Sequence, residues 1–108
     1  KDLIFLKRQK GIVIVEGYLL FHKPAVRKLL DFRVFLTAGE KTRVKRRKNF
    51  KSEKYIKKIL SPDYIEKIVL PMHKKYIEPT KKFADLILNT EKYSIKECAK
   101  KIIKFLRT

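Results

Sequence analysis

The segment GIVIVEGYLLF, residues 11–21, constrains the fold of this chain more than any other part of it. Four β-branched residues at 12–15 form an unbroken apolar run, which ends on the carboxylate of Glu16 and on Gly17. Such a run, bounded by glycines, is typical of a strand buried inside a parallel sheet. Open α/β sheets bind their ligands beyond the carboxyl ends of the strands. The sequence therefore predicts a buried strand at 12–15 and places Glu16 at the ligand-binding edge.

Length and composition favour one small folded domain. The chain has 108 residues, of which 44% are hydrophobic, so we expect a single domain over residues 1–108 without extensive disorder. Cys98 is the single cysteine, which excludes an internal disulfide and a cysteine-based zinc site, and we expect it to be an inert buried thiol. The apolar runs are too short for a membrane span, and we expect a cytoplasmic protein.

The charge of the chain is strongly unbalanced. Its 29 lysines and arginines against 11 acidic residues give a formal net charge of +18. This imbalance favours polyanionic partners, such as nucleic acid or ligands that carry phosphate. It is equally compatible with lysines that only solvate helix faces. Charge alone therefore names no function.

Hydrophobic periodicity, together with the positions of glycine, proline and helix-capping residues, predicts an alternation of strands and helices. Strands that alternate with helices imply right-handed crossovers, and hence a three-layer α/β fold in which helices flank a parallel sheet. Ser94 and Glu97 form a capping box before the last helix. Residues 3–6 are a short apolar strand or helix, and after the strand at 12–15 we expect a short helix at 24–30 and a strand at 33–36. A helix follows from 41 to about 60, with an interruption at 49–52, and a second helix starts at 61–63, kinks at Pro71 and ends at Pro79. The last two predicted elements are a strand at 83–89 and a helix over 95–106.

Two groups of residues suggest chemistry at the carboxyl edge of the sheet. Glu16 offers a hard oxygen ligand for Mg²⁺, although a carboxylate at a strand end also caps loops or pairs with lysine. Arg43, Arg46 and Arg47 recur at i, i+3 and i+4 and so share a helical face. Guanidinium groups bind phosphoryl oxygens and neutralise charge in phosphoryl transfer, so this helix is a candidate lid. A nucleic-acid-binding helix and a solvated face remain open alternatives.

No further catalytic constellation is recognisable in the sequence. His22 and His73 are too far apart to suggest a metal site, and no serine or cysteine triad can be assembled. The phosphate-loop motif GxxxxGK[ST] and the dinucleotide motif GxGxxG do not occur in the 108 residues.

Several phrases nevertheless resemble one family. VIVEGYLLF (13–21), DFRVFL (31–36), TRVKRR (42–47) and VLPMHKKYIEPTKKFADLIL (69–88) are similar to the carboxyl-terminal part of uridine kinases, in the uridine kinase and phosphoribulokinase group of P-loop kinases. The last phrase is the most specific. EGYLLFHKP also resembles nicotinamide riboside kinases, a sister group. The resemblance covers nearly the whole chain and implies a partial P-loop kinase fold.

The resemblance implies ATP-dependent phosphoryl transfer to the primary hydroxyl of a nucleoside, with ATP and Mg²⁺ as cofactors. It implies that Glu16, which matches the family's acid near Mg²⁺, is a metal ligand and a catalytic residue. Arg43, Arg46 and Arg47 match the first three arginines of the family's lid, RLxRRxxRD, and are implied to bind the nucleotide, Arg46 and Arg47 also with a catalytic role. The final Arg-Asp pair of that lid would fall at residues 50–51 and is lost.

In the family, the phosphate loop and the general-base aspartate precede the matching region, and Asp2 does not match the latter. We therefore expect this chain not to be competent alone, and a longer parent or another chain to supply the loop. Two alternatives stay open: a non-catalytic basic module that binds nucleic acid or phosphorylated ligands, and a degenerate subunit that docks on a complete kinase. The resemblance also implies a homo-oligomer, and the short apolar runs predict no membrane partner.

Overall fold

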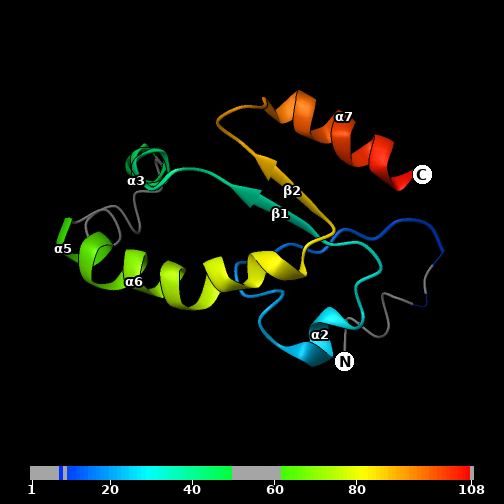
Figure 1. Cartoon of the computed structure of the whole chain (residues 1–108), viewed down its shortest axis with the longest axis horizontal. Coiled ribbons are helices and arrows are strands. Elements are labelled where there is room, and N and C mark those ends of the chain that lie inside the picture. The colour runs from blue at the N-terminus through cyan, green and yellow to red at the C-terminus, as the bar shows by residue number, and fades with distance from the viewer. Residues whose placement is uncertain (1–7, 9, 50–61, 108) are drawn as a thin grey trace.

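The computed structural model describes residues 8, 10–49 and 62–107 of the chain. Helices and two strands alternate along these residues, as expected for an α/β fold (Figure 1). The segment at 3–6, and residues 50–60 of the helix expected at 41–60, lie outside the described residues. None of the described helices is long and apolar enough to cross a membrane. The elements are α2 (Pro24–Arg27), β1 (Val34–Thr37), α3 (Glu40–Lys48), α5 (Pro62–Tyr64), the π-helix η1 (Ile65–Val69), α6 (Leu70–Met72), the π-helix η2 (His73–Ile77), the 3-10 helix η3 (Glu78–Phe83), β2 (Leu86–Asn89) and α7 (Ile95–Leu106).

β1 and β2 form a parallel sheet, so the predicted parallel pairing is confirmed for these strands. The register aligns Val34 with Leu86. Two hydrogen bonds between Arg33 and Asp85 hold the two strands in this register at their amino-terminal ends. The Asp85 carboxylate accepts the Arg33 N–H at 2.8 Å, and the Asp85 N–H donates to the Arg33 carbonyl at 2.8 Å. β1 lies one residue later than predicted, and β2 lacks the first three predicted residues. A wider three-layer sheet stays a prediction.

The prediction of a buried strand at 12–15 is wrong for this chain. Residues 12–17 have no regular secondary structure, and the Ile12 and Ile14 side chains are 79% and 87% exposed. A strand needs a neighbour for its backbone hydrogen bonds, and an all-apolar strand needs cover on both faces. Among the described residues this run pairs with neither β1 nor β2, which pair only with each other. The run thus has strong β propensity but no partner.

A helix of alternating turn types runs continuously from α5 to η3. Pro71, which is expected to kink it, lies in α6 between two π-helical segments. Proline has no N–H and crowds the preceding turn, and wider π turns accommodate this without ending the helix. The wider helix ends at Ile77, two residues before Pro79, and the chain continues through Pro79 as the tighter 3-10 helix η3, so Pro79 marks a change of helix type and not the end of the helical path. Thr80 is buried and donates to the Ile77 carbonyl at 2.6 Å.

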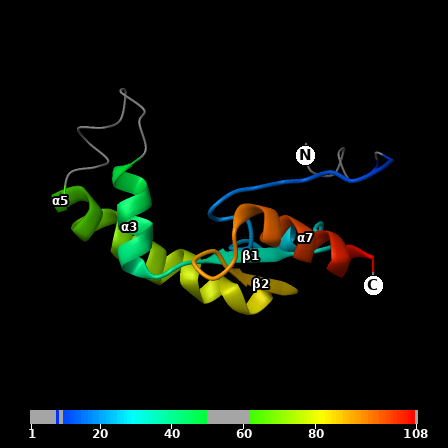
Figure 2. The same cartoon turned by 90° about the horizontal axis from the view of Figure 1, so that it is seen from above.

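α7 begins as predicted. The Ser94 hydroxyl accepts the Glu97 N–H at 3.1 Å, and the Glu97 carboxylate accepts the Ser94 N–H at 3.0 Å, which confirms the capping box. The helix runs back along the sheet (Figure 2) and buries Cys98, as its position on the apolar face predicts. At its end Phe105 packs against Phe32, with ring centroids 4.8 Å apart. α7 is therefore tied to the residues just before β1.

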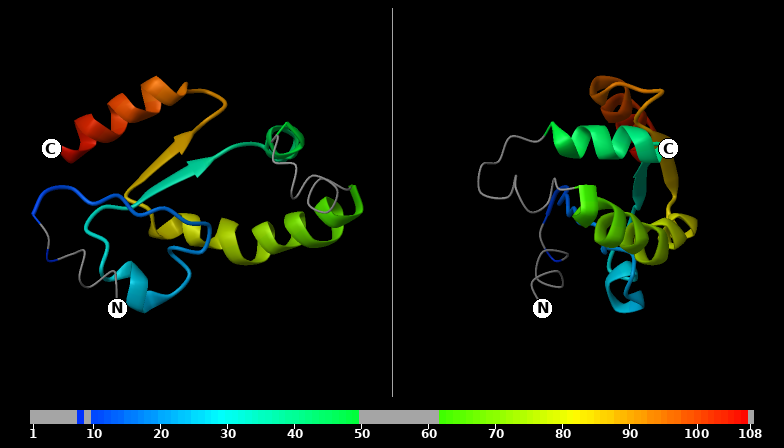
Figure 3. Two further views of the ribbon diagram at one scale, coloured as in Figure 1. Left: turned by 180° about the vertical axis from the view of Figure 1, so that it is seen from behind. Right: turned by 90° about the vertical axis from the view of Figure 1, so that its left-hand side faces the viewer.

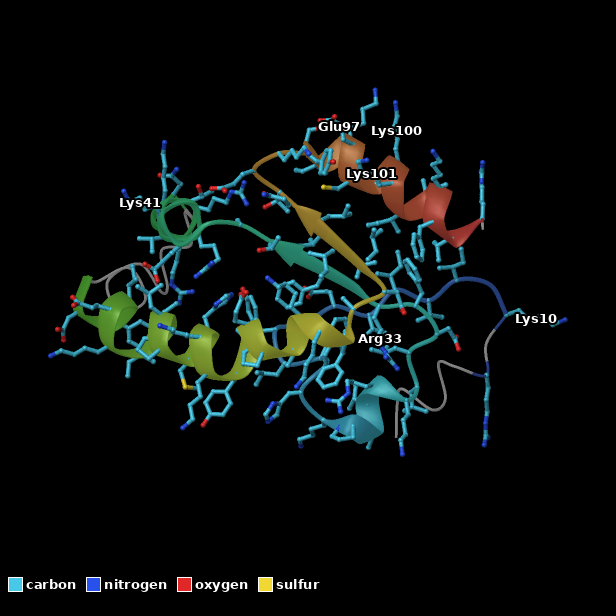
Figure 4. The ribbon with its side chains drawn as sticks, viewed as in Figure 1. Lys10, Arg33, Lys41, Glu97, Lys100 and Lys101 are labelled. Carbon is cyan, nitrogen blue, oxygen red and sulfur yellow. The ribbon has the colours of Figure 1, made fainter. Side chains whose placement is uncertain are left out.

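Two arginines join α2 to the end of η3. The Arg27 guanidinium stacks over the Phe83 ring, 3.7 Å from its centroid, and donates to the Phe21 carbonyl at 2.6 Å. Arg33 donates to the Arg27 carbonyl at 2.8 Å and to the Phe83 carbonyl at 3.5 Å. Figure 4 shows Arg33 between α2 and the sheet. These contacts hold the turn that carries the buried Phe21 against the amino-terminal end of the sheet.

Candidate functional site at the carboxyl edge of the sheet

The carboxyl ends of β1 and β2 lie side by side because the strands are parallel. β1 leads through Gly39 into the basic helix α3. β2 leads into a turn that contains Thr90 and Glu91 and precedes α7. Figure 3 shows α3 projecting from this end of the sheet. The sheet thus brings together polar residues from two distant parts of the sequence.

Arg46 connects these two segments. Its guanidinium donates to the Thr90 hydroxyl at 2.7 Å and to the Thr90 carbonyl at 3.1 Å. The Thr90 hydroxyl donates in turn to the Thr37 carbonyl at 3.1 Å, and the same carbonyl accepts the Thr90 N–H at 2.8 Å. This chain of hydrogen bonds fixes α3 against the turn after β2. It also places a guanidinium at the carboxyl edge of the sheet.

Arg43 lies one turn earlier on α3 and donates to the Ala38 carbonyl at 2.7 Å. Its positive charge also reaches η2, where burial first, and the Arg43 guanidinium second, lower the pKa of His73 below its usual value of 6.5. The Glu78 and Glu40 carboxylates oppose this shift. His73 is therefore mostly neutral at neutral pH, and it adds no positive charge to the arginine face of α3.

Glu91, in the turn after β2, contacts the amino-terminal end of α3 at this edge of the sheet. Its carboxylate accepts hydrogen bonds from the Thr42 hydroxyl and from the Gly39 N–H. These two hydrogen bonds lower the pKa of Glu91 below its usual value of 4.5, and the Arg46 charge contributes to the same shift. A Cβ atom at Gly39 would lie 3.3 Å from both carboxylate oxygens, so glycine permits this approach. The result is a negative charge at the amino-terminal end of α3, where the helix dipole favours it.

We expect Glu91→Gln to lower the melting temperature of the chain at neutral pH but not in acid. A carboxyl group with a depressed folded pKa stabilises the fold above its unfolded pKa, and this contribution is lost as the pH falls through the folded pKa. The difference between wild type and variant should therefore shrink as the pH falls below 4.5. Thermal melts followed by circular dichroism measure this difference. Glu66→Gln, at an exposed helical position, is the control, and a Glu91 effect that is undiminished in strong acid contradicts the explanation.

The structure brings two of the four predicted site residues together. Arg43 and Arg46 both reach the carboxyl edge, and Arg47 follows on the same helix. Glu16 lies in the irregular segment 12–17 with an exposed side chain. Within the described ranges, no cluster of three His, Cys, Asp or Glu residues is suited to hold a metal ion. Among the described residues, Glu16 is therefore not part of a cluster of three such ligands.

Sequence reasoning missed two residues of this corner, Thr90, which accepts from Arg46, and Glu91, which accepts from Thr42. Both directly follow the strand that ends at Asn89. The rule that selected Glu16, a polar residue just beyond the carboxyl end of a strand, applies equally to them. The signal was therefore present, but only the pairing of β2 with β1 shows that these residues meet α3.

The arrangement is suited to bind an anion. Arg43 and Arg46 are anchored through one and two guanidinium nitrogens, respectively, and a guanidinium carries more N–H donors than these contacts use. The anchoring contacts also restrict the side chains, so less conformational entropy is lost when a ligand binds. Two fixed guanidinium groups thus lie at this edge with a mostly neutral His73, while the Glu91 carboxylate offsets part of the positive charge near Arg46.

The sequence is similar to those of several curated proteins, although no family model matches it. It is 37% identical over 81 residues to a uridine kinase of Clostridium perfringens, a match that covers 73% of this chain and 38% of that kinase. A uridine kinase of Ligilactobacillus salivarius is 35% identical over 80 residues, with the same coverage of 73% and 38%. A uridine kinase of Clostridium novyi is 33% identical over 90 residues, which are 82% of this chain and 42% of the relative. The chain thus spans about two fifths of the length of the curated relatives that it matches.

Proposed function

We propose that this chain, which belongs to the uridine kinase family over the residues that it shares with that family, takes part in ATP-dependent phosphoryl transfer to the primary hydroxyl of a nucleoside. The observation that carries this proposal is the identity of 33% to 37% with proteins named uridine kinase. The position of Arg43 and Arg46 supports it, because the carboxyl edge is where open α/β sheets bind ligands.

In this proposal the arginines of α3 bind the phosphates of ATP. Arg43 and Arg46 offer guanidinium donors that are not used in anchoring, and Arg47 adds a third positive charge on the same helix. Positive charge that is already fixed in place stabilises the charge that develops on a transferred phosphoryl group without reorganisation during the reaction. The three arginines would thus bind the nucleotide, and Arg46 and Arg47 would act on the transition state.

Glu16 is suited to part of a Mg²⁺ site. Its exposed carboxylate is a hard oxygen donor, and Mg²⁺ in nucleotide sites takes one or two carboxylates together with phosphate oxygens and water. Bound Mg²⁺ neutralises charge on the phosphoryl oxygens. The motif GxxxxGK[ST] does not occur in the 108 residues, so the cradle for the phosphates comes from polypeptide outside this sequence.

A chimera tests the proposed function. The part of the Clostridium perfringens uridine kinase that aligns with this chain is replaced by the corresponding residues of this chain. We expect the chimera to form uridine monophosphate from uridine and ATP, as its parent does in the same assay. A chimera that unfolds cooperatively but phosphorylates no common nucleoside would refute the proposal.

We expect Glu16→Gln in this chimera to raise the Mg²⁺ concentration required for half-maximal activity. The amide keeps the size of the side chain but loses the negative charge, and changes around metal ligands typically cost about 10- to 100-fold in affinity or activity. Initial rates over a Mg²⁺ titration at saturating ATP measure the shift. Glu66→Gln removes another exposed carboxylate and should leave the titration unchanged. An unchanged titration for the Glu16 variant excludes the metal role.

One specific observation favours a second function, the binding of nucleic acid. α7 presents a basic face opposite the buried Cys98, and Figure 4 shows Lys100 of this face pointing away from the sheet. Glu97 is the one acid in the α7 sequence, and its carboxylate is engaged in the capping box. We propose that this face contacts the phosphate backbone of nucleic acid without reading its sequence. Its residues recur at i, i+4, i+8 and i+11 and are Lys96, Lys100, Lys104 and Arg107.

We expect binding of a duplex oligonucleotide to weaken steeply as the salt concentration rises. Replacing three lysines of the basic face by glutamine, at positions 96, 100 and 104, should reduce the slope of log affinity against log salt by about 3, since each phosphate contact contributes about one. Fluorescence anisotropy at several salt concentrations measures the slope. The matched control replaces the exposed Lys74, Lys75 and Lys82. Equal slopes for the two triple variants contradict a role for α7 and indicate only a general effect of net charge.

A further inference from the structure

β2 has one open edge, on the side away from β1, which we call the outer edge. The Leu86 and Thr90 N–H groups donate to carbonyls of the segment 33–37, at 3.2 and 2.8 Å. Backbone groups of successive strand residues alternate in direction, so those of Ile87 and Asn89 point to the outer edge. The Asn89 carbonyl accepts two N–H groups of the following turn, at 3.2 and 3.0 Å, whereas no strand among the described residues pairs with the outer edge. Both backbone groups of Ile87 and the Asn89 N–H therefore form a short template for a further strand.

A hollow of about 360 Å³ lies beside this edge, between β2 and α7. Residues 86–88 of β2 line it together with Tyr93 and Phe105, and Lys101 and Lys104 of α7 border it. Among the described residues, none that lines this hollow belongs to β1. In the view of Figure 1, β2 lies between β1 and α7. The flank of α7 that carries the two lysines thus extends over the outer edge, where the side chains of an added strand would lie.

The hollow is basic where it meets α7. The Lys101 Nζ lies 4.4 Å from the centroid of the Tyr93 ring, and the Lys92 Nζ lies 5.4 Å from the same centroid. These cation–π contacts hold both ammonium groups beside the carboxyl end of β2. Lys104 follows Lys101 by one helical turn and also belongs to the basic face of α7 described above. Because Glu97, the one acid of α7, is held in the capping box, the hollow is complementary to negatively charged side chains.

The opposite face of the sheet is apolar beside the outer edge. Ile87 is 47% exposed there, whereas the next residue, Leu88, points toward α7 and is only 2% exposed. Successive side chains of a strand point to opposite faces. A strand added at the outer edge would therefore place alternate side chains beside Ile87 and in the hollow. A sequence that suits both faces alternates apolar residues, which cover Ile87, with acidic residues, which reach Lys101 and Lys104.

We propose that the outer edge of β2 binds an extended segment of a partner protein in which acidic and apolar residues alternate. The segment pairs with Ile87 and Asn89 through backbone hydrogen bonds and places its carboxylates beside Lys101 and Lys104. A second copy of this chain is a poor occupant, because each copy carries a net charge of +18 and no two acidic residues of its sequence are two positions apart. The inference goes beyond the proposed function, since the two lysines lie outside the candidate site at the carboxyl edge.

Three synthetic peptides with blocked ends test the preference for alternation and for charge. TEVEVET carries the proposed pattern, TVVEEET has the same composition without the alternation, and TQVQVQT keeps the alternation without the charge. We expect the 108-residue chain to bind TEVEVET about 10-fold or more tightly than either control, because each control loses several hydrogen bonds or ion pairs of modest individual strength. Fluorescence anisotropy of labelled peptides measures the affinities. Equal affinities for TEVEVET and TVVEEET show only general charge attraction, and equal affinities for TEVEVET and TQVQVQT exclude an acidic partner; either result overturns the inference.

Two double variants locate the peptide on the protein. Replacing Lys101 and Lys104 by glutamine should weaken the binding of TEVEVET about 5- to 10-fold, as expected for the loss of two exposed ion pairs. The matched control replaces Lys74 and Lys75 by glutamine, which removes the same charge from exposed positions of η2. The control should change the affinity by less than about twofold, because salt screens distant charges. Equal losses in the two double variants overturn the placement of the segment beside α7.

Hydrogen exchange tests the backbone contact independently of the lysines. Saturating TEVEVET should slow the exchange of the Ile87 amide about 10-fold or more, because a paired amide exchanges only when its strand opens. The Leu88 amide, which faces β1, is the internal control and should change less. An Ile87 amide whose exchange the peptide leaves unchanged overturns the inference. An Ile87 amide that is already slow without peptide also overturns it, because residues of the chain itself or a second copy then occupy the edge.

The same experiment on the Clostridium perfringens chimera separates this inference from the proposed function. Every residue of the outer edge belongs to the 108 residues that the chimera contains, so we expect the peptide to protect the Ile87 amide there as well. Protection in a chimera that phosphorylates no nucleoside supports the docking edge and refutes the function. An active chimera whose Ile87 amide the peptide does not protect supports the function and overturns the docking edge.

Discussion

Leu88→Ala is expected to abolish cooperative unfolding of the 108-residue chain. Leu88 is 2% exposed in β2, where it lines the junction with α7 beside Tyr93 and Phe105. Truncating a buried leucine to alanine removes its contacts and leaves a cavity, at a cost of about 2–5 kcal/mol. The total free energy of unfolding of a small domain is only about 5–15 kcal/mol. Few other apolar side chains in the described residues are as well buried, so we expect the total free energy of unfolding of this chain to lie at the lower end of its range.

Urea titration followed by far-UV circular dichroism measures this loss. Leu36→Ala is the matched control, because it removes the same atoms from the register partner of Leu88, which is 58% exposed. The control should cost well below about 1 kcal/mol, as surface substitutions usually do. Similar midpoints for the two variants would show that Leu88 is not part of the core.

The parts of the fold that depend on local signals were predictable from the sequence. The capping box at Ser94 sets the start of α7 through two hydrogen bonds within one turn, and both are present. The parallel pairing of β1 with β2 follows from the alternation of strands and helices. Helix propagation past Pro79 was not predictable from proline alone, because the same residue either ends a helix or begins a turn of 3-10 helix.

The run at 12–15 shows the limit of such predictions. Its sequence carries a clear preference for a buried strand, but a strand exists only where another strand accepts its hydrogen bonds. Among the described residues no strand pairs with the run, so the preference is not realised. The same limit applies to the candidate site. The sequence shows the helical spacing of the arginines, whereas the contacts of Arg46 with Thr90 depend on how β2 lies beside β1.

Arg46→Ala is expected to lower kcat/KM of the chimera for uridine phosphorylation by about 100- to 1,000-fold, the loss typical for one preorganised donor to developing charge. Arg46→Lys keeps the charge but not the forked donor, and should recover only part of the activity. Steady-state rates with ATP and uridine measure both variants. Arg46→Ala also removes the hydrogen bonds to Thr90, so a lower rate could arise from a displaced α3 alone.

Thr90→Val separates these two explanations. Valine removes the hydroxyl that accepts from Arg46 and that donates to Thr37, but it leaves the guanidinium and the Thr90 carbonyl contact in place. If Arg46 acts on the phosphates, Thr90→Val should cost at most about 10-fold, through looser positioning, while Arg46→Ala costs far more. If Arg46 serves only to hold α3, the two variants should lose similar activity and similar stability. In that case the catalytic charge on α3 must come from Arg43 and Arg47.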